Sequence, residues 1–195
     1  MSQPIILFDL GGVLADLGDP VAAIGLDMSD EQFWDMWLSS PLVYELETGQ
    51  LSAEDFVTRF AAEIGFDDAD GFDRAIRSWQ LPMFDGAEQY LRSLSGSMQV
   101  ALLSNTNEMH WQHVQSQTDV FATFSKLFLS YETGFAKPHA AAFHDVVRHF
   151  ACEPADIFFL DDNPNNVAAA KAAGLRARQA RGLAAAKQAV NELLG

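Results

Sequence analysis

The sequence predicts an α/β fold with a mainly parallel sheet and an inserted helical subdomain. Short apolar runs alternate with segments of helical periodicity, a pattern typical of parallel α/β proteins. Between the first two runs, however, a long stretch carries helical segments and no good strand candidate. The chain of 195 residues also exceeds a typical domain of ~100–150 residues. We therefore expect one large domain or a core with a small appended one.

The predicted strands are the short apolar runs. In chain order they are Ile5–Phe8, Val100–Leu103, Leu127–Leu129, Ile157–Leu160 and, less distinctly, Leu175–Arg178.

Helices are predicted between these runs from residues that typically begin or end helices and from apolar residues at helical spacing. Pro138 is expected to begin one at its first turn, with Ala142, Val146 and Phe150 at the spacing of a buried face. A second is expected to start at Asn163-Pro164 and to end at Gly174. The closing stretch, Leu183 to Leu194, is a further amphipathic candidate.

Residues 16–84 are predicted to form a helical cap, and residues 1–15 and 85–195 the core into which it is inserted. Helical segments are expected at Asp30–Leu38 and at Ser52–Ile64, where Ser52 and Asp55 form a capping pattern. Gly- and Pro-containing segments flank the cap and are the expected hinges. The apolar cluster Phe33, Trp34, Met36 and Trp37 is interpreted as the core of the cap rather than as a substrate surface.

The charge balance narrows the function classes. The chain has 12 Lys plus Arg against 27 Asp plus Glu, a net charge of −15, which repels polyanions and argues against nucleic acid or an anionic membrane as partner. Cys152 is the single cysteine, so an intrachain disulfide is impossible. Neither a signal peptide nor a membrane-spanning run is recognisable. We therefore expect a soluble, cytoplasmic protein.

Three predicted strands end in polar residues, which are Asp9, Ser104-Asn105 and Asp161-Asp162. Ligands of open α/β sheets collect outside the carboxyl ends of strands, so we expect these residues to share one site. Two carboxylates ~4 Å apart repel by roughly 4 kcal/mol at an effective dielectric near 20. Such a pair usually needs a cation or a proton.

Lys137 precedes a predicted helix start, where backbone amides also favour anions. Together with a divalent ion, its ammonium could balance the charge of Asp9, Asp161 and Asp162 and bind phosphate oxygens. Donors that are all oxygen, in a chain without a cysteine pair, favour Mg²⁺ over zinc.

In order and spacing, four segments resemble the four motifs of the haloacid dehalogenase-like hydrolase superfamily. They are Asp9-Leu10-Gly11-Gly12-Val13, Ser104-Asn105-Thr106, Lys137-Pro138 and Asp161-Asp162-Asn163. The chain looks most like the small-capped sugar-phosphatase branch. That resemblance implies a Rossmann-like core, a helical cap inserted after the first motif, and hydrolysis of a small phosphorylated metabolite.

The resemblance also implies roles for individual residues. Asp9 would attack phosphorus and form an aspartyl-phosphate, while its carboxylate and the Gly11 carbonyl bind Mg²⁺. Asp162 matches the principal acidic metal ligand, with Asp161 binding or orienting the metal's waters. Lys137 would neutralise Asp9 and the phosphate. The predicted phosphate-binding residues are Gly11, Gly12, Ser104, Asn105 and Lys137, and Asn166 stands where many relatives have another acid.

Gly11 departs from the majority pattern. Most phosphatases of the superfamily carry a second aspartate at this position, as general acid and then base, which is typically worth 10²–10⁴ in rate. Asp16, a metal-bound water or a cap residue could take over that role, although Asp16 is interpreted as a hinge or flap residue. Glu45 and Glu47 could face the substrate, but capping of the turn before Ser52 is the favoured interpretation.

Two other functions stay open. A metal-independent 2-haloacid dehalogenase is compatible with Gly11, but the acids Asp161 and Asp162 are unsuited to a halide pocket. A member that has lost catalysis and binds a phosphorylated ligand or a protein partner would not need the nucleophile Asp9. His110, on a predicted helix, makes no recognisable zinc pattern with the other histidines and is assigned to a helix surface or to partial burial.

Overall fold

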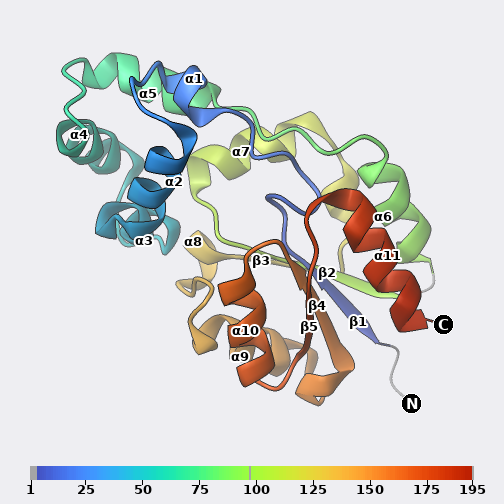
Figure 1. The fold of residues 1–195 in the computed structure, drawn as a ribbon. Helices are drawn as coiled ribbons and strands as arrows, with labels where there is room; N and C mark the ends of the chain where they lie inside the picture. The colour runs from blue at the N-terminus through green and yellow to red at the C-terminus, as the bar shows by residue number, and fades with distance from the viewer. Residues whose placement is uncertain (1–3, 97, 195) are drawn as a thin grey trace.

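The computed structural model describes residues 4–96 and 98–194, so residues 1–3, 97 and 195 of the predicted core lie outside it. The fold is a parallel sheet with helices on both faces and a group of helices beyond one end (Figure 1). The strands are β1 (Ile5–Phe8), β2 (Gln99–Ser104), β3 (Lys126–Leu129), β4 (Ile157–Asp161) and β5 (Arg176–Gln179). Their order is β3-β2-β1-β4-β5, and all four pairings are parallel.

Alternate residues of each central strand face opposite layers. Ile6 and Phe8 of β1 pack with α6 (Ala87–Ser95), α7 (Glu108–Gln117) and α11 (Gly182–Leu194). Ile5 and Leu7 pack with α9 (Ala140–Phe150) and α10 (Pro164–Ala172) on the other face. All four side chains of β1 are buried because both faces of a parallel sheet are covered, which is why such strands read as continuous apolar runs. The predicted α/β class with a parallel sheet is confirmed.

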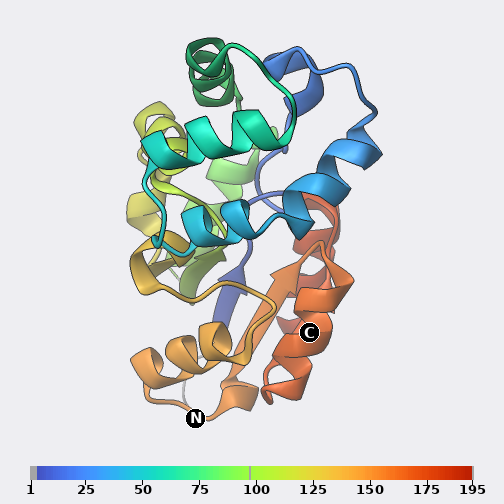
Figure 2. The same ribbon diagram turned by 90° about the vertical axis from the view of Figure 1, so that its left-hand side faces the viewer.

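The helices after the first strand gather at one end of the sheet (Figure 2). They are α1 (Pro20–Ile24), α2 (Asp30–Ser39), α3 (Pro41–Glu47), α4 (Ala53–Glu63) and α5 (Ala69–Ser78). A separate apolar cluster, which includes Phe33, Trp37 and Phe60, lies among them. We call these helices the cap helices and this cluster the cap cluster.

The two segments that join the cap helices to the sheet run side by side. The Asp16 amide donates to the Pro82 carbonyl at 2.8 Å, and the Phe84 amide donates to the Leu14 carbonyl at 2.9 Å. Ala15 and Met83 form an antiparallel bridge at the same place. The cap helices are therefore connected through a short paired neck.

The remaining elements are short. They are the α-helix α8 (Ser130–Thr133) and the 3-10 helices η1 (Val120–Thr123) and η2 (Pro154–Asp156). Helix α9 begins at Ala140, two residues later than predicted from Pro138. The reason is a turn in which the His139 amide donates to the Ala136 carbonyl at 3.0 Å, so His139 is the extended residue before the helix. Within the described part of the chain, none of the helices has the length and hydropathy needed to cross a membrane.

Candidate active site

The carboxyl ends of three neighbouring strands deliver the predicted polar residues to one place. Asp9 follows β1, Ser104 is the last residue of β2, and Asp161 is the last residue of β4. The Asp9 amide still donates to the Leu160 carbonyl at 2.8 Å, so the residue continues the pairing of β1 with β4. Because β1 lies between β2 and β4, its carboxylate stands at the centre of the sheet edge.

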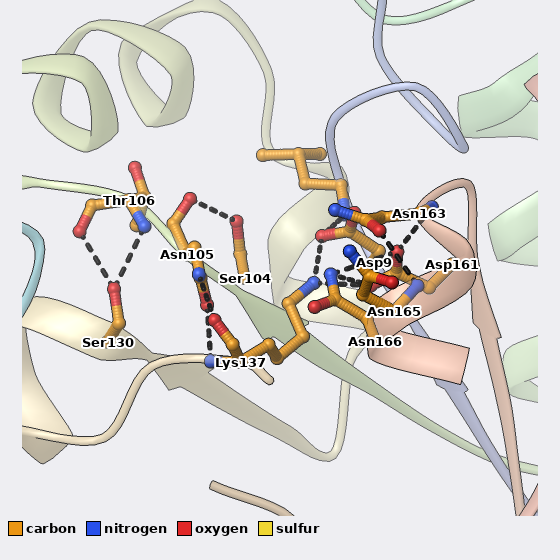
Figure 3. A network of polar contacts seen from close by, with 11 residues as sticks. Asp9, Ser104, Asn105, Thr106, Ser130, Lys137, Asp161, Asn163, Asn165 and Asn166 are labelled. Carbon is orange, nitrogen blue, oxygen red and sulfur yellow. Dashed lines mark hydrogen bonds and ion pairs between the residues drawn. The ribbon is translucent and has the colours of Figure 1, made fainter. Parts of the chain in front are cut away.

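Lys137 bridges two carboxylates (Figure 3). Its Nζ lies 2.7 Å from Asp9 Oδ1 and 2.7 Å from Asp161 Oδ2, and only 2% of the lysine side chain is exposed. Burial pulls the pKa of Lys137 down, but the Asp161 and Asp9 charges outweigh it and hold the pKa above its ordinary value. Burial raises the pKa of Asp9 to about 7, against the opposing effect of Lys137. The Lys137 ammonium therefore compensates the charges of Asp9 and Asp161, which lie close together and shielded from water.

Asp161 is held from several sides. Its Oδ1 accepts from the Asn163 amide at 2.8 Å, and Asn166 Nδ2 lies 3.1 and 3.0 Å from its two oxygens. The residue is fully buried. Asn166, a residue without an assigned role in the sequence analysis, therefore donates to the Asp161 carboxylate. Asp161 thus fixes the position of Lys137.

Asn105 is engaged by the backbone of Lys137. Its Nδ2 donates to the Lys137 carbonyl and its Oδ1 accepts from the Lys137 amide, both at 2.8 Å (Figure 3). Ser130 Oγ similarly accepts from the Thr106 amide and donates to the Thr106 carbonyl. Among the described residues, the Ser104 hydroxyl makes only a long contact of 3.4 Å, with the Asn105 carbonyl, and Ser104 lines the cleft. Ser104 can therefore turn to a ligand, whereas Asn105 positions Lys137.

The glycine pair after Asp9 lets the loop approach the second acid. Gly12 has φ +70°, and a Cβ there would lie 2.5 Å from Asp162 Oδ2, so a side chain is excluded on both counts. The Gly12 amide already donates to the Ala15 carbonyl at 2.8 Å. Gly11 lines the cleft, where a Cβ would meet the tip of Leu17 at 2.6 Å.

Three carboxylates converge on one point. Oxygen atoms of Asp9, Asp161 and Asp162 lie within 4.8 Å of one another. Burial, with the charge of Asp161, raises the pKa of Asp162. A cluster of carboxylates in which the pKa values of Asp9 and Asp162 are raised, with oxygen as the only donor atom, suits a hard divalent cation such as Mg²⁺. The residues present therefore fit the predicted metal.

Asp9, Asp162, Ser104 and Lys137 line a cleft of about 680 Å³ between the sheet edge and the cap helices. Its wall from the cap is largely aromatic and apolar and includes Trp34, Trp37, Leu38 and Tyr44. Tyr44 also touches His139 of the core, with ring centroids 5.6 Å apart. The cleft is thus polar at the strand ends and apolar on the opposite side.

Two cleft residues were given other roles by the sequence analysis. His110 is buried and not at a helix surface, stacking on Trp37 and lying edge-on to Trp79 at 4.8 Å. Burial lowers its pKa to about 4. Glu47, interpreted as a turn-capping residue, faces the cleft. The packing of the cap helices against α7 places His110, and the packing of α3 on α8 places Glu47. No local sequence pattern indicates either placement.

Comparison with known proteins agrees with this geometry. A family model for haloacid dehalogenase-like hydrolases matches residues 4–174. D-ribitol-5-phosphate phosphatase of Bacteroides thetaiotaomicron is 29% identical over 89% of this chain and 90% of its own length. Flavin mononucleotide hydrolase 1 of Arabidopsis thaliana is 28% identical over 88% of this chain and 70% of its own length.

Solved structures give the same picture. A family enzyme from Bacteroides thetaiotaomicron, in complex with magnesium and inorganic phosphate, superposes with a TM-score of 0.77 and 25% identity, covering 92% of this chain and 94% of that one. The L-2-haloacid dehalogenase of Xanthobacter autotrophicus superposes with a TM-score of 0.69 over 92% of this chain and 78% of that one. Its 21% identity supports a shared fold alone.

Proposed function

Because the chain belongs to the haloacid dehalogenase-like hydrolase family, we propose that it is a Mg²⁺-dependent phosphomonoesterase acting on a small phosphorylated metabolite, with a sugar or polyol phosphate as the leading class. The observation that carries the proposal is the convergence of Asp9, Asp161 and Asp162 beside the Lys137 ammonium. The 29% identity to a D-ribitol-5-phosphate phosphatase over most of both chains supports the substrate class.

In the proposed first step Asp9 attacks phosphorus. The Leu10 amide at 2.8 Å and Lys137 Nζ at 2.7 Å both contact Oδ1, so the carboxylate is held at one oxygen and we assign the attack to Oδ2. The bond from phosphorus to the leaving oxygen breaks as the Asp9–phosphorus bond forms. Water then attacks the aspartyl-phosphate, releasing phosphate and restoring Asp9.

Catalysis of phosphoryl transfer is mostly positioning and charge stabilisation. Lys137 would offset charge on Asp9 and on the phosphoryl oxygens, and Ser104 would donate to another of those oxygens. Asp9, Asp162 and the Gly11 carbonyl would hold Mg²⁺, while Asp161 acts through Lys137 and Asn166. When bound, the cation neutralises the acids and the phosphoryl group.

We assign residues 1–15 and 85–195 to the catalytic core and residues 16–84 to the cap. The paired neck at Ala15 and Met83 supports this division. A cap whose two chain connections to the core both pass through this neck could open to admit substrate and close to exclude water.

The dehalogenase alternative is weaker. A halide pocket needs no cluster of acids, and here Asp161 and Asp162 stand beside the nucleophile. The likeness to the solved dehalogenase supports the fold only. A catalytically inactive binding protein would have no need of the buried Asp9–Lys137 pair, which costs desolvation energy to maintain.

Phosphate release tests the proposal. Purified protein would be given a panel of sugar phosphates, polyol phosphates, nucleotides and short-chain phosphoacids, with Mg²⁺ or with a chelator. We expect release that needs Mg²⁺ and is abolished in Asp9→Asn. No release from any compound by wild type would reject a phosphatase, and halide release from 2-haloacids with the chelator present would favour the dehalogenase.

A further inference from the structure

We propose that Glu47, the last residue of helix α3 in the cap, is the general acid and base that the loop after Asp9 lacks. The proposal rests on the proposed phosphatase function. Gly11 occupies the position where that role would be expected, and it has no side chain to carry a proton. A proton donor must therefore reach the leaving oxygen from elsewhere.

The cleft lining leaves few candidates. Among the described residues, the carboxylates that line it are Asp9, Glu47 and Asp162. Asp9 is the nucleophile and Asp162 belongs to the proposed metal site, so each already has a role. Asp16 is exposed, lies outside the lining, and its Oδ1 accepts from the Gly18 amide at 3.0 Å. Glu47 is the remaining carboxylate that faces the reaction space.

Helix α3 holds Glu47 at the boundary between cap and core. The helix ends at Glu47, and the Thr48 hydroxyl donates to the Tyr44 carbonyl at 2.6 Å. Gly49 has φ +70° and packs so closely on the core that a Cβ there would lie 2.4 Å from the Tyr131 carbonyl oxygen. The turn after Glu47 is therefore seated directly on helix α8, which limits the movement of the carboxyl group.

The position of Glu47 also suits proton exchange with a leaving group. It comes from the cap side, opposite the strand ends where Asp9 and Lys137 would hold the phosphoryl group. In-line displacement places the leaving oxygen on the side of phosphorus away from Asp9. A donor on the cap side is thus on the side where the leaving alkoxide forms.

The surroundings set its protonation. Glu47 is partly buried, and burial raises its pKa to about 7, opposed by hydrogen bonding with the Trp37 side chain and by the charge of Lys137. The other titratable side chains on the wall outside the acid cluster are Tyr44, His110, His139 and Arg181. A carboxyl group that titrates near neutral pH can both give and take a proton there.

The two half-reactions balance. In the first, the protonated Glu47 gives its proton to the leaving alkoxide as the phosphorus–oxygen bond breaks and the Asp9–phosphorus bond forms. In the second, the Glu47 carboxylate takes a proton from the attacking water as the new phosphorus–oxygen bond forms and the Asp9–phosphorus bond breaks. The cycle consumes one water and leaves Glu47 protonated.

Burst kinetics with Glu47→Gln test the proposal. An aryl phosphate such as p-nitrophenyl phosphate has a good leaving group and needs no acid, whereas an alkyl phosphate does. With the aryl ester we expect a burst of about one nitrophenolate per enzyme at nearly the wild-type rate, then turnover slowed roughly 10²–10⁴-fold because water lacks its base. With the alkyl ester we expect slowing of the same order and no burst of alcohol.

Glu45→Gln is the matched control. Glu45 lies on the same helix, outside the cleft lining, with Oε2 3.6 Å from Arg59 Nη1. We expect its kinetics to resemble wild type with both esters. If Glu47→Gln behaves like this control, the assignment of the acid and base is wrong. If wild type hydrolyses neither ester nor any compound of the panel, the proposed function itself fails, which is a distinct result.

Chemical rescue gives a second readout that does not depend on the amide variant. In Glu47→Ala, added formate or acetate should restore alkyl-ester turnover in proportion to its concentration, and it should have no effect on Glu45→Ala. Equal responses of the two alanine variants would overturn the proposal.

Discussion

The two sides of the cleft are built by opposite kinds of interaction. The strand-end side, formed by Asp9, Lys137 and Asp161, is held by charged contacts of 2.7 Å. The cap side is held by packed aromatic side chains. The ring centroids of the stacked pair Phe56 and Phe60 are 5.0 Å apart, and Trp37 lies edge-on to Phe60 at 5.6 Å. Charged hydrogen bonds are short and directional, while aromatic packing is broad and tolerant of small shifts.

These two kinds of interaction suit two different tasks, which are holding the reacting groups and accommodating the leaving group. The reacting groups need fixed positions, because displacements of about 1 Å can cost 10²-fold in rate. A wall that contacts the leaving group can instead vary in shape while its cluster stays packed. We therefore expect substitutions at the strand ends to abolish phosphate release and to change stability by an amount that depends on pH. Substitutions within the cap cluster should act mainly by lowering stability.

The largest expected effect is that of Asp9→Asn on chemistry. Loss of the proposed nucleophile should reduce phosphate release roughly 10⁴-fold or more, because an amide cannot form the proposed aspartyl-phosphate. The fold should persist, since the variant removes one of three clustered negative charges. Phosphate release and circular dichroism of the same preparation check both statements, and activity above one per cent of wild type would contradict the assignment.

Lys137→Met should lower both activity and stability. Removing a buried cation that pairs with Asp9 and Asp161 leaves their charges uncompensated, which costs about 3–5 kcal/mol. This cost should shrink as the pH falls, because burial raises the pKa of Asp9 to about 7 and protonation of Asp9 removes its uncompensated charge. Denaturant unfolding of variant and wild type between pH 8 and pH 5 measures the difference, and a constant difference would contradict the charge argument.

Phe60→Ala is the counterpart in the cap cluster. Phe60 is fully buried among Phe56, Phe72 and Trp37, so the cavity should cost about 3–5 kcal/mol. No titrating group is removed, and the cost should therefore be equal at pH 8 and pH 5. The same unfolding series checks it. If the loss of stability in Phe60→Ala depended on pH as in Lys137→Met, the contrast drawn between the two sides of the cleft would be wrong.

His110→Gln should change the pH dependence of stability. In the fold the pKa of His110 is about 4, against 6.5 when unfolded, so the unfolded chain binds the extra proton first as pH falls. Wild type should lose up to about 3 kcal/mol between pH 6.5 and pH 4 from this group. The variant should lack that share of the slope, and identical slopes would mean that His110 does not titrate on unfolding.

Much of the strand-end side could be predicted because each of its strand-end residues follows from a local pattern, whatever the order of the strands in the sheet. Asp9, Ser104 and Asp161 each end an apolar run, and parallel strands place their carboxyl ends at one edge. The predicted start of α9 at Pro138 is wrong, because the His139 amide first closes a turn with the Ala136 carbonyl and the helix begins at Ala140.

Other roles depended on partners far away in the sequence. Asn105 was predicted to bind phosphate, yet its amide group is engaged by the backbone of Lys137, 32 residues further on. His110 was assigned to a surface or to partial burial, but the cap rings Trp37 and Trp79 cover it.

The sequence by itself allowed the fold class, the strands and the candidate acids and lysine of the site to be predicted. These follow from local patterns, since an apolar run followed by a polar residue specifies both the strand and its tip. Only the tertiary structure decided which oxygen meets Lys137, why Gly12 can carry no side chain, and that Glu47 faces the cleft. Those outcomes depend on how cap and core pack together, and packing joins residues that no local pattern relates.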